Sequence, residues 1–323
     1  VCDDLNDYIT GILGQSGHPQ ARTPNVEKLA SSGVAFRHAY SNNPVCAPSR
    51  SSFLTGIYCH VSGNLFWNKW FNNPVLKNSN TLMQQFKANG YHVVGSGKLM
   101  HHQRKSDWDE FAHQADYGPV VYDGKERVAH PSVPMPFQSI GSIDGSFASL
   151  ADVPYAEDDN PKSGWIYGAW GKKPKPYRYL SETDRDPTPD ERNAQWAAQR
   201  IKRFSAAKDG KPFFLAVGFI RPHTPLHVPQ KYFDMFPLDG LQLPVIRDGD
   251  AEDTHFSKHV GEEDKGPRYY KTLLESYPEK AQAIRAFTQA YLASVAAADE
   301  CIGQVVDAVD NSPLKDNTII IMT

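Results

Sequence analysis

The sequence has little net charge, few cysteines and no long hydrophobic run. Its 34 Lys and Arg residues nearly balance 37 Asp and Glu residues, for a formal net charge of −3. The positive excess typical of nucleic-acid-binding proteins is missing, so no nucleic-acid partner is predicted. The longest wholly apolar stretch, Phe213 to Ile220, is far shorter than the ~20 residues of a membrane-spanning helix, so no membrane span is predicted. Four cysteines without metal-type spacing argue against a zinc cluster and a disulfide scaffold.

The remaining composition, 40% hydrophobic and 22% charged, is that of a folded domain with a sizeable core. Helical segments that begin at threonine or asparagine and end at glycine alternate with short apolar strands. The expected helices are 23–33, 80–90, 188–210 and a long alanine-rich helix after Pro278, and the expected strands are 34–40, 91–94, 213–219 and 318–323. Near-continuous apolar strands between helices are typical of a parallel sheet covered on both faces. The sequence therefore predicts an α/β fold.

One long segment, 103–187, lacks this periodicity. Ten of the 24 prolines lie between Pro119 and Pro189. Long stretches without secondary structure are unusual in compact domains unless they shape a binding site. We therefore expect 103–187 to be an irregular insertion within one domain, 1–323, that forms a lid or substrate wall. A surface excursion without function is the alternative.

A short helix is expected from Pro48 to Gly56, which places Cys46 at its amino terminus. Free backbone N–H groups and the helix dipole favour anions there, and Arg50 lies about one turn away on the same face. Residues 46–56 resemble the sulfatase signature Cys-x-Pro-Ser-Arg-x-x-x-Leu-Thr-Gly. The resemblance implies that a maturation enzyme oxidises Cys46 to formylglycine, whose hydrate is the nucleophile. A buried structural cysteine is the alternative.

The pair Asp3-Asp4 offers two carboxylates, hard oxygen ligands that suit Ca²⁺ or Mg²⁺. Neighbouring residues of a strand point to opposite faces, so both can reach one ion only where a strand ends. Strand ends are also where ligands bind in open α/β sheets. With Asn6, the pair resembles the metal pair of sulfatases, which implies a Ca²⁺ or Mg²⁺ site built from Asp3, Asp4 and the group at Cys46. A solvated turn is the alternative.

The run Gly97-Lys98-Leu99-Met100-His101 follows the second predicted strand. It resembles the Gly-Lys motif of sulfatases in its iduronate-sulfatase-like form. Lys98 can supply a point charge for a sulfate oxygen, which makes it a catalytic and substrate-binding candidate. The resemblance implies that His101 contacts the formylglycine hydrate, and the neighbouring His102 is the alternative for this contact.

A histidine is also presented just beyond the strand 213–219. His223 is well placed there for proton transfer. Its segment again resembles the iduronate-sulfatase-like branch, which implies that His223 contacts the sulfate and serves the leaving group. The spacing to His227 could suggest zinc on a helix, but Pro225 prevents a regular helical face. We expect His227 to shape the pocket or to be structural.

Several tryptophans could stack on sugar rings while their polar edges bind hydroxyl groups. Core packing is the alternative for each of them. The candidates for substrate binding are Trp67 and Trp70, together with Trp165 and Trp170 of the insertion.

The resemblance covers almost the whole chain but only part of a sulfatase. Sulfatases place a second acidic metal pair and a further lysine after a strand like 318–323. We therefore interpret the sequence as a segment that is incomplete at both ends. We expect the missing C-terminal segment to act in cis or as a second chain. The resemblance alone suggests a periplasmic, secreted or lysosomal location.

Taken together, the motifs imply a mostly parallel, alkaline-phosphatase-like central sheet flanked by helices. The implied reaction is hydrolysis of sulfate esters, with a sulfated saccharide or polysaccharide as the expected substrate. One alternative is a phosphate or phosphonate ester hydrolase of the same superfamily. The other is a noncatalytic protein that binds sulfated glycans and keeps Cys46 as a thiol.

Overall fold

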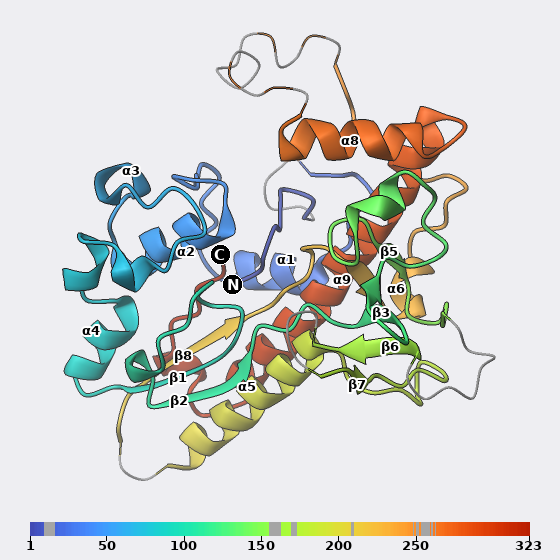
Figure 1. Ribbon diagram of the computed structural model, residues 1–323. Helices are drawn as coiled ribbons and strands as arrows, with labels where there is room; N and C mark the ends of the chain where they lie inside the picture. Colours follow the sequence, from blue (N-terminus) through green and yellow to red (C-terminus); the bar gives the residue numbers. More distant parts are fainter. Residues whose placement is uncertain are drawn as a thin grey trace.

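A three-stranded parallel sheet lies at the centre of the fold. The computed structural model describes residues 1–9, 17–154, 163–168, 173–207, 210–247, 249, 252, 259, 261 and 263–323. The strands lie in the order β2 (Glu110–Gln114), β1 (His92–Gly97), β8 (Phe213–Gly218). Both neighbours run parallel to β1, and Val94 lies opposite Leu215. The predicted parallel sheet is therefore present (Figure 1).

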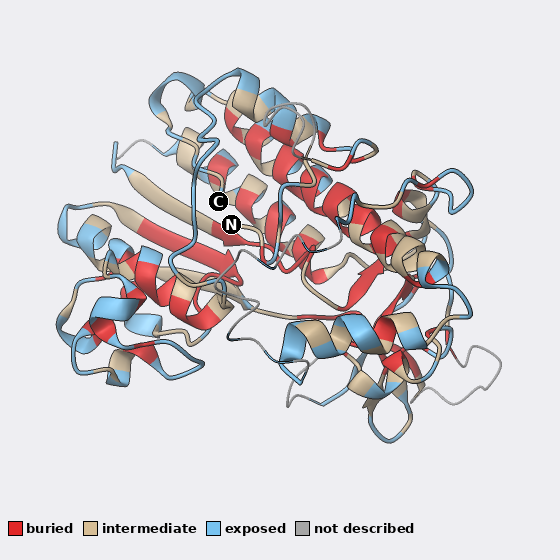
Figure 2. Ribbon diagram, turned by 90° about the horizontal axis from the view of Figure 1, so that it is seen from above, coloured by how far each residue is buried: buried red, intermediate tan, exposed pale blue. Residues whose placement is uncertain are grey.

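Helices cover this sheet on both faces. Phe214 and Val93 pack in one cluster with Met83 of α4 (Leu82–Ala88). Leu215 and Val217, which alternate with Phe214 along β8, pack in another cluster with residues of α5 (Pro189–Ala206) and α9 (Lys280–Asp310). Figure 2 shows buried residues concentrated in the sheet and along the long helix. The α/β prediction is confirmed in this arrangement.

Each predicted helix is present, within a few residues of its expected ends. The remaining α-helices are α1 (Pro24–Ser31), α2 (Cys46–Thr55), α3 (Cys59–Ser62), α6 (Gln230–Phe233) and α8 (Lys265–Glu275), of which the last three were not predicted. Thr81 and Thr188 each form a capping box with the residue three positions later, which fixes the start of α4 and of α5. Thr23, in contrast, makes no capping hydrogen bond to α1. The carboxylate of Asp299 on α9 accepts the first N–H groups of α1 instead.

Two predicted strands are absent from the described residues. Segment 34–40 forms no strand, and Val34, Phe36 and Tyr40 are exposed. Segment 318–323 is also not assigned to a strand, although the Cys2 N–H donates to the Thr323 carbonyl at 2.9 Å. Apolar and β-branched residues favour a pleated surface only where a neighbouring strand completes the ladder. Composition alone therefore overestimates strand in both segments.

The segment 103–187 is more regular than expected. It contains β2 of the central sheet and an antiparallel sheet in the order β4-β3-β6-β7, which packs beside the central part of the molecule (Figure 1). Its strands are β3 (Val120–Asp123), β4 (Arg127–Val128), β6 (Ser163–Tyr167) and β7 (Lys175–Pro176), and β5 (Phe147–Ser149) pairs in parallel with β9 (Leu226–Val228). The short 3₁₀ helices of the chain are Trp70–Asn72, Leu76–Asn78, Lys105–Asp107, Phe137–Ile140 and Lys315–Asn317. Strands of two to five residues, one ending in an edge proline, leave too short a pattern for periodicity to reveal.

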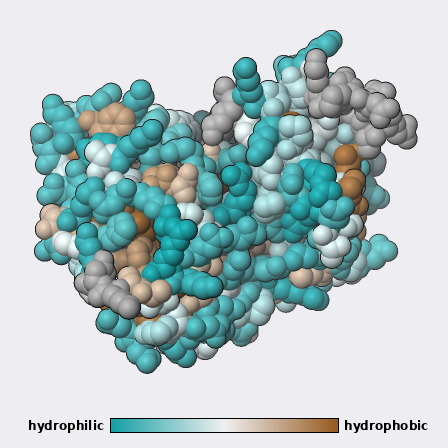
Figure 3. Space-filling view, turned by 90° about the horizontal axis from the view of Figure 1, so that it is seen from below, coloured by the Kyte–Doolittle hydropathy of each residue, from teal (hydrophilic) through white to brown (hydrophobic). Residues whose placement is uncertain are grey.

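The surface agrees with the composition. The face in Figure 3 is mostly hydrophilic, and its hydrophobic residues gather in a few small patches, as is usual for folded proteins. Across the part of the chain that the structure describes, every helix is too short or too polar to cross a lipid bilayer.

A buried histidine joins the antiparallel sheet to β9. His227 is fully buried, with Nδ1 2.8 Å from the Pro119 carbonyl oxygen and Nε2 2.8 Å from Ser146 Oγ. A carbonyl only accepts, so Nδ1 donates its proton and Nε2 accepts from the Ser146 hydroxyl. Burial holds the pKa of His227 well below its ordinary value. His227 is therefore a structural residue, one of the two roles expected for it, and it shares no metal-ligand group with His223 among the described residues.

This histidine makes a testable contribution to stability against acid. Its folded-state pKa is depressed, so below about pH 6.5 the unfolded chain binds a proton that the folded protein excludes. Stability should therefore fall as the pH decreases through this range, by up to about 1.4 kcal/mol per pH unit from His227. His227→Asn retains a donor toward Pro119 and should show a shallower loss in urea unfolding between about pH 5 and pH 8. The exposed His60→Asn serves as control, and identical pH dependence in both variants would contradict the assignment.

Candidate active site

Three chain segments meet at one edge of the central sheet. Cys2 forms a parallel bridge with Phe219 beyond β8, and the Asp3 N–H donates to the Phe219 carbonyl at 3.1 Å. Lys98 directly follows β1, and His223 lies shortly beyond β8. The predicted candidates Asp3, Asp4, Lys98 and His223 thus lie at strand ends, on the side where parallel strands present ligand-binding residues.

Two glycines allow β1 and β8 to approach each other closely at this edge. Gly97 has a φ of 84°, and a Cβ added there would lie 1.9 Å from the Gly218 carbonyl oxygen. A Cβ on Gly218 would lie 2.0 Å from the Lys98 carbonyl oxygen. No side chain fits at either position. This close approach permits the hydrogen bond of 2.9 Å from the Lys98 N–H to the Gly218 carbonyl, which fixes Lys98 at the site.

A buried carboxylate holds two cations at the centre of the site. Asp3 is 3% exposed, and its Oδ1 accepts from Arg50 Nη2 at 2.8 Å while its Oδ2 accepts from Lys98 Nζ. Lys98 is 1% exposed. Burial opposes ionisation of Asp3, but the charges of Arg50 and Lys98 outweigh it and lower the pKa of Asp3 below its usual value. Asp3 is therefore an anion surrounded by positive charge.

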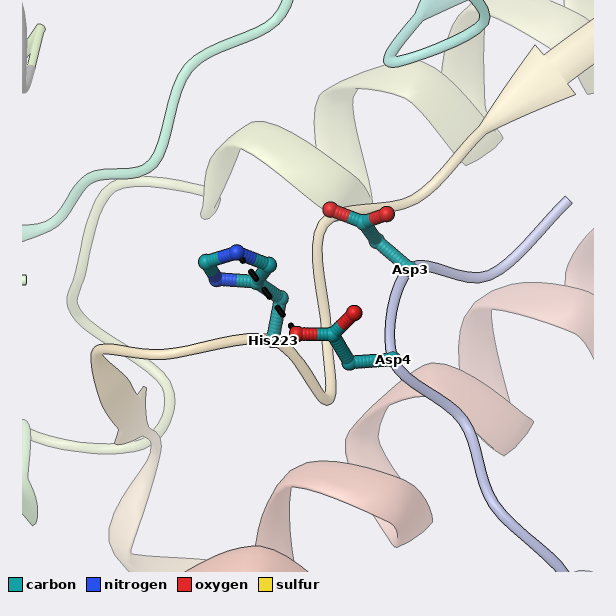
Figure 4. Close-up of side chains that lie close together, drawn as sticks. All are labelled: Asp3, Asp4 and His223. Carbon is teal, nitrogen blue, oxygen red and sulfur yellow. Dashed lines mark ion pairs between the residues drawn. The ribbon is translucent and has the colours of Figure 1, made fainter. Parts of the chain in front are cut away.

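The backbone turns out of the extended conformation at Asp4, the second carboxylate. Asp4 has a φ of 58°, a left-handed conformation that aspartate tolerates better than most residues. This turn breaks the alternation of a strand, and one ligand atom each from Asp3, Asp4 and His223 lies within 4.8 Å of the others. Figure 4 shows the three side chains together, with His223 Nε2 3.6 Å from Asp4 Oδ2.

The donor set of this group fits a hard divalent cation. Two adjacent carboxylates provide oxygen ligands of the kind that Ca²⁺ and Mg²⁺ prefer, whereas imidazole is a ligand of softer metals. Asp3 and Asp4 would hold such an ion, which leaves His223 to act on a substrate. Cys46 is not a member of this group, so the structure does not place Cys46 with the other predicted metal ligands.

Cys46 is instead the first residue of α2 and starts the helix earlier than predicted. It is half-buried and forms no disulfide. Gly56 closes the helix with a φ of 72°, as the motif predicts. Arg50, one turn later, is buried and also donates from Nη1 to the Leu99 carbonyl oxygen at 3.1 Å. Arg50 therefore extends from α2 to the residues that follow β1.

His101 and His102 lie side by side after Lys98. Their ring centroids are 4.9 Å apart. Desolvation, together with the charges of Lys98 and His102, lowers the pKa of His101 to about 4. His101 is therefore a neutral imidazole near neutral pH, able to accept a hydrogen bond. The His102 carbonyl accepts from the Trp70 indole N–H at 2.9 Å, so this backbone segment is fixed by the protein core.

The tryptophans divide between core and surface. Trp70 is 2% exposed and packs in the core cluster beside the sheet, so the prediction that it binds substrate is wrong. Trp165 is also buried and stacks on His130. Trp67 is 50% exposed and remains a candidate for sugar stacking. Trp170 lies outside the described residues.

One site residue was missed by the sequence analysis. Tyr117, from the segment 103–187, contacts Lys98 Nζ through its hydroxyl and packs edge-on against His223, with ring centroids 5.1 Å apart. Desolvation by burial, followed by the negative charge of Asp3, raises the pKa of Tyr117. The available signal was its position just after β2, a strand that periodicity did not reveal. At least this part of the insertion lines the site.

The arrangement suits chemistry on an anion. A cysteine at a helix amino terminus lies on the same helix as Arg50, which shares the Asp3 carboxylate with Lys98, and His223 faces the second carboxylate. Fixed positive charges of this kind stabilise oxyanions in water-poor sites.

Comparison with known proteins agrees with these motifs. Residues 1–323 match the family model described as Sulfatase. The chain is 31% identical to a protein named Sulfatase from Formosa agariphila, over 99% of this chain and 56% of that protein. It is 27% identical to mouse (Mus musculus) iduronate 2-sulfatase, over 100% of this chain and 52% of that protein. The chain thus spans about half the length of the curated relatives it matches.

Solved structures show the same fold. The phosphonate monoester hydrolase of Silicibacter pomeroyi superposes with a TM-score of 0.56 at 19% identity, over 98% of this chain and 60% of that chain. A likeness at this identity concerns the fold alone. It confirms the predicted alkaline-phosphatase-like α/β architecture.

Proposed function

Because the chain belongs to the sulfatase family, we propose that its protein hydrolyses sulfate esters, with a sulfated saccharide or polysaccharide as substrate. The observation that carries the proposal is the buried set of Arg50, Asp3 and Lys98 beside the helix that begins at Cys46. The name of the iduronate 2-sulfatase relative supports a sugar sulfate as the substrate class. The exposed Trp67 supports the same choice.

Two groups supplied after synthesis complete this proposal. A formylglycine hydrate derived from Cys46 by a maturation enzyme would provide the nucleophile for sulfur, and a Ca²⁺ or Mg²⁺ ion at Asp3 and Asp4 would provide positive charge. Position 46 fits, because it lies at a helix amino terminus, is half-buried and is not bound in a disulfide.

The chain's own residues then have separate tasks. Lys98 and Arg50 hold fixed positive charge beside the sulfur centre and stabilise charge that builds up on the sulfate oxygens. His101, a neutral imidazole, accepts a hydrogen bond at position 46. His223 acts in its doubly protonated, imidazolium form: it binds a sulfate oxygen, gives the proton on Nε2 to the ester oxygen of the departing sugar alcohol, and keeps the proton on Nδ1. The burial of Lys98 and Asp3 keeps water away from these charges.

The function is tested with three esters that share one aryl leaving group: a sulfate, a phosphate and a phosphonate. The full-length protein, produced together with a maturation enzyme, should show a kcat/KM for the sulfate at least about 100-fold above the other two, a difference of about 2.7 kcal/mol in transition-state stabilisation. Preference for the phosphonate would instead support the superfamily alternative. Binding of sulfated glycans without hydrolysis, with Cys46 still a thiol, would support a noncatalytic protein.

The role of His223 makes a prediction about leaving groups. His223→Ala should slow hydrolysis of a sugar sulfate by about 10² to 10⁴-fold, because an alkoxide needs a proton to depart. An activated aryl sulfate, whose phenolate leaves without a proton, should be slowed far less. The ratio of kcat values for the two substrates is the measurement, and the aryl sulfate is the internal control. Equal losses on both would assign His223 to sulfate binding alone.

A further inference from the structure

The backbone carbonyl of the next residue, Thr224, fixes the orientation of the His223 ring. Nδ1 lies 2.6 Å from the Thr224 carbonyl oxygen. A carbonyl only accepts, so Nδ1 carries a proton and donates it. This leaves Nε2 as the nitrogen that faces Asp4 (Figure 4). A ring turned over would present the wrong nitrogen.

Thr224 is in turn held by a carboxylate from another part of the fold. Its Oγ1 donates to Asp144 Oδ1 at 2.8 Å and lies 3.3 Å from His223 Nδ1. Asp144 belongs to the turn before β5, and its Oδ2 lies 2.9 Å from Nζ of Lys265, the first residue of α8. The polar chain Lys265–Asp144–Thr224–His223 thus links α8, drawn across the top of Figure 1, to the sheet edge.

The charge state of Asp144 suits this connection. Burial opposes its ionisation, but the bonds from Lys265 and Thr224 outweigh burial and lower the pKa of Asp144. An ionised carboxylate can only accept, so the Thr224 hydroxyl has a single orientation, with its hydrogen toward Asp144. Charge-assisted bonds of this type are stronger than neutral ones and hold geometry more tightly.

We propose that Thr224 and Asp144 are positioning residues for His223, and that they keep its Nε2 directed at the leaving oxygen. The proposal rests on the proposed function, in which His223 protonates the leaving alcohol. Lys265 has a smaller part, because its side chain is half-exposed and ion pairs of this kind contribute little. A role limited to closing the turn would affect folding but would not distinguish between leaving groups.

The effect should appear in kcat for poor leaving groups. A misplacement of about 1 Å in a reacting group can cost on the order of 100-fold in rate. Thr224→Val, which keeps the shape and removes the hydroxyl, should lower kcat for a sugar sulfate by about 10 to 100-fold with little change in KM. The activated aryl sulfate should change by less than about 3-fold, because it depends little on proton donation.

Matched variants separate positioning from general damage. Thr224→Ser keeps the hydroxyl and should retain nearly wild-type kcat. Asp144→Asn keeps an acceptor for Thr224 and should lose less than Asp144→Ala, while Lys265→Met should stay within about 3-fold of wild type. The double variant Thr224→Val with Asp144→Ala should be no slower than the worse single variant, because both remove the same hydrogen bond.

The outcomes are distinct in the full-length, matured protein. Equal losses on both esters, additive losses in the double variant, or a Thr224→Ser variant as slow as Thr224→Val would overturn the positioning role. If Thr224→Val does not fold, as judged by its melting temperature, the comparison of Asp144→Asn with Asp144→Ala decides the question alone. A wild-type protein that hydrolyses no sulfate ester would refute the proposed function itself, and the positioning role with it.

Discussion

Cys46→Ala should abolish sulfate-ester hydrolysis while the protein stays folded. Loss of a nucleophile that forms a covalent intermediate typically costs at least about 10⁴-fold in kcat. The side chain is small, half-buried and at the first position of α2. The helix keeps its closing glycine, so the change in unfolding free energy should stay within about 0.5 kcal/mol. Turnover and thermal unfolding of the full-length protein are the measurements.

The modification itself is checked by mass spectrometry of the peptide that contains Cys46. We expect the aldehyde at this position in active protein and the thiol at Cys59, which is buried and donates to the Asn42 carbonyl at 3.3 Å. Cys59→Ala is the matched control, since it removes a cysteine from the neighbouring helix α3 and should keep full kcat. Fully active protein with an unmodified thiol at Cys46 would refute the proposed nucleophile.

The helices of this fold could be predicted because local chemistry decides them. Thr188 and Glu191 have the spacing of a capping box and form one, and Gly56 is the left-handed residue that ends α2. Strands depend on partners far along the chain, and here prediction was weaker. Phe213–Gly218 was recognisable because it is a continuous apolar run with packed residues on both faces, whereas Glu110–Gln114 carries polar residues and was not.

The site residues also divide into those that a local pattern predicts and those that only tertiary packing brings together. Lys98 and His223 come after predicted strands, and Asp3 was expected where a strand ends, so their meeting at one sheet edge could be anticipated from topology. Tyr117 and Asp144 come from a segment whose short strands gave no signal. Their contacts with Lys98 and Thr224 depend on tertiary packing that no local pattern encodes. Trp70 was predicted to bind substrate but lies in the core, because an aromatic residue suited to sugar stacking is equally suited to core packing.

The two carboxylates of the predicted cation site should respond differently to substitution. Asp4 is exposed, with its side chain 60% accessible, whereas Asp3 is buried between Arg50 and Lys98. Asp4→Asn removes one charged ligand and should lower both metal occupancy and kcat, the latter by about 10² to 10³-fold. It should leave the melting temperature of the metal-free protein nearly unchanged. Elemental analysis, kinetics and thermal unfolding of the same preparations give the three values.

Asp3→Asn should lose the metal, the activity and stability together. The substitution leaves two buried cations without their shared carboxylate, and breaking a buried ion pair from one side costs about 3 to 5 kcal/mol. Metal-free Asp3→Asn should therefore melt well below metal-free Asp4→Asn, even though each variant lacks one carboxylate.

Exhaustive chelation of the wild type should remove activity, and Ca²⁺ or Mg²⁺ should restore it, with the more effective ion identifying the metal. Undiminished turnover in protein shown to be free of metal would mean that Asp3 only holds Arg50 and Lys98 in place, and that these cations alone stabilise the sulfate.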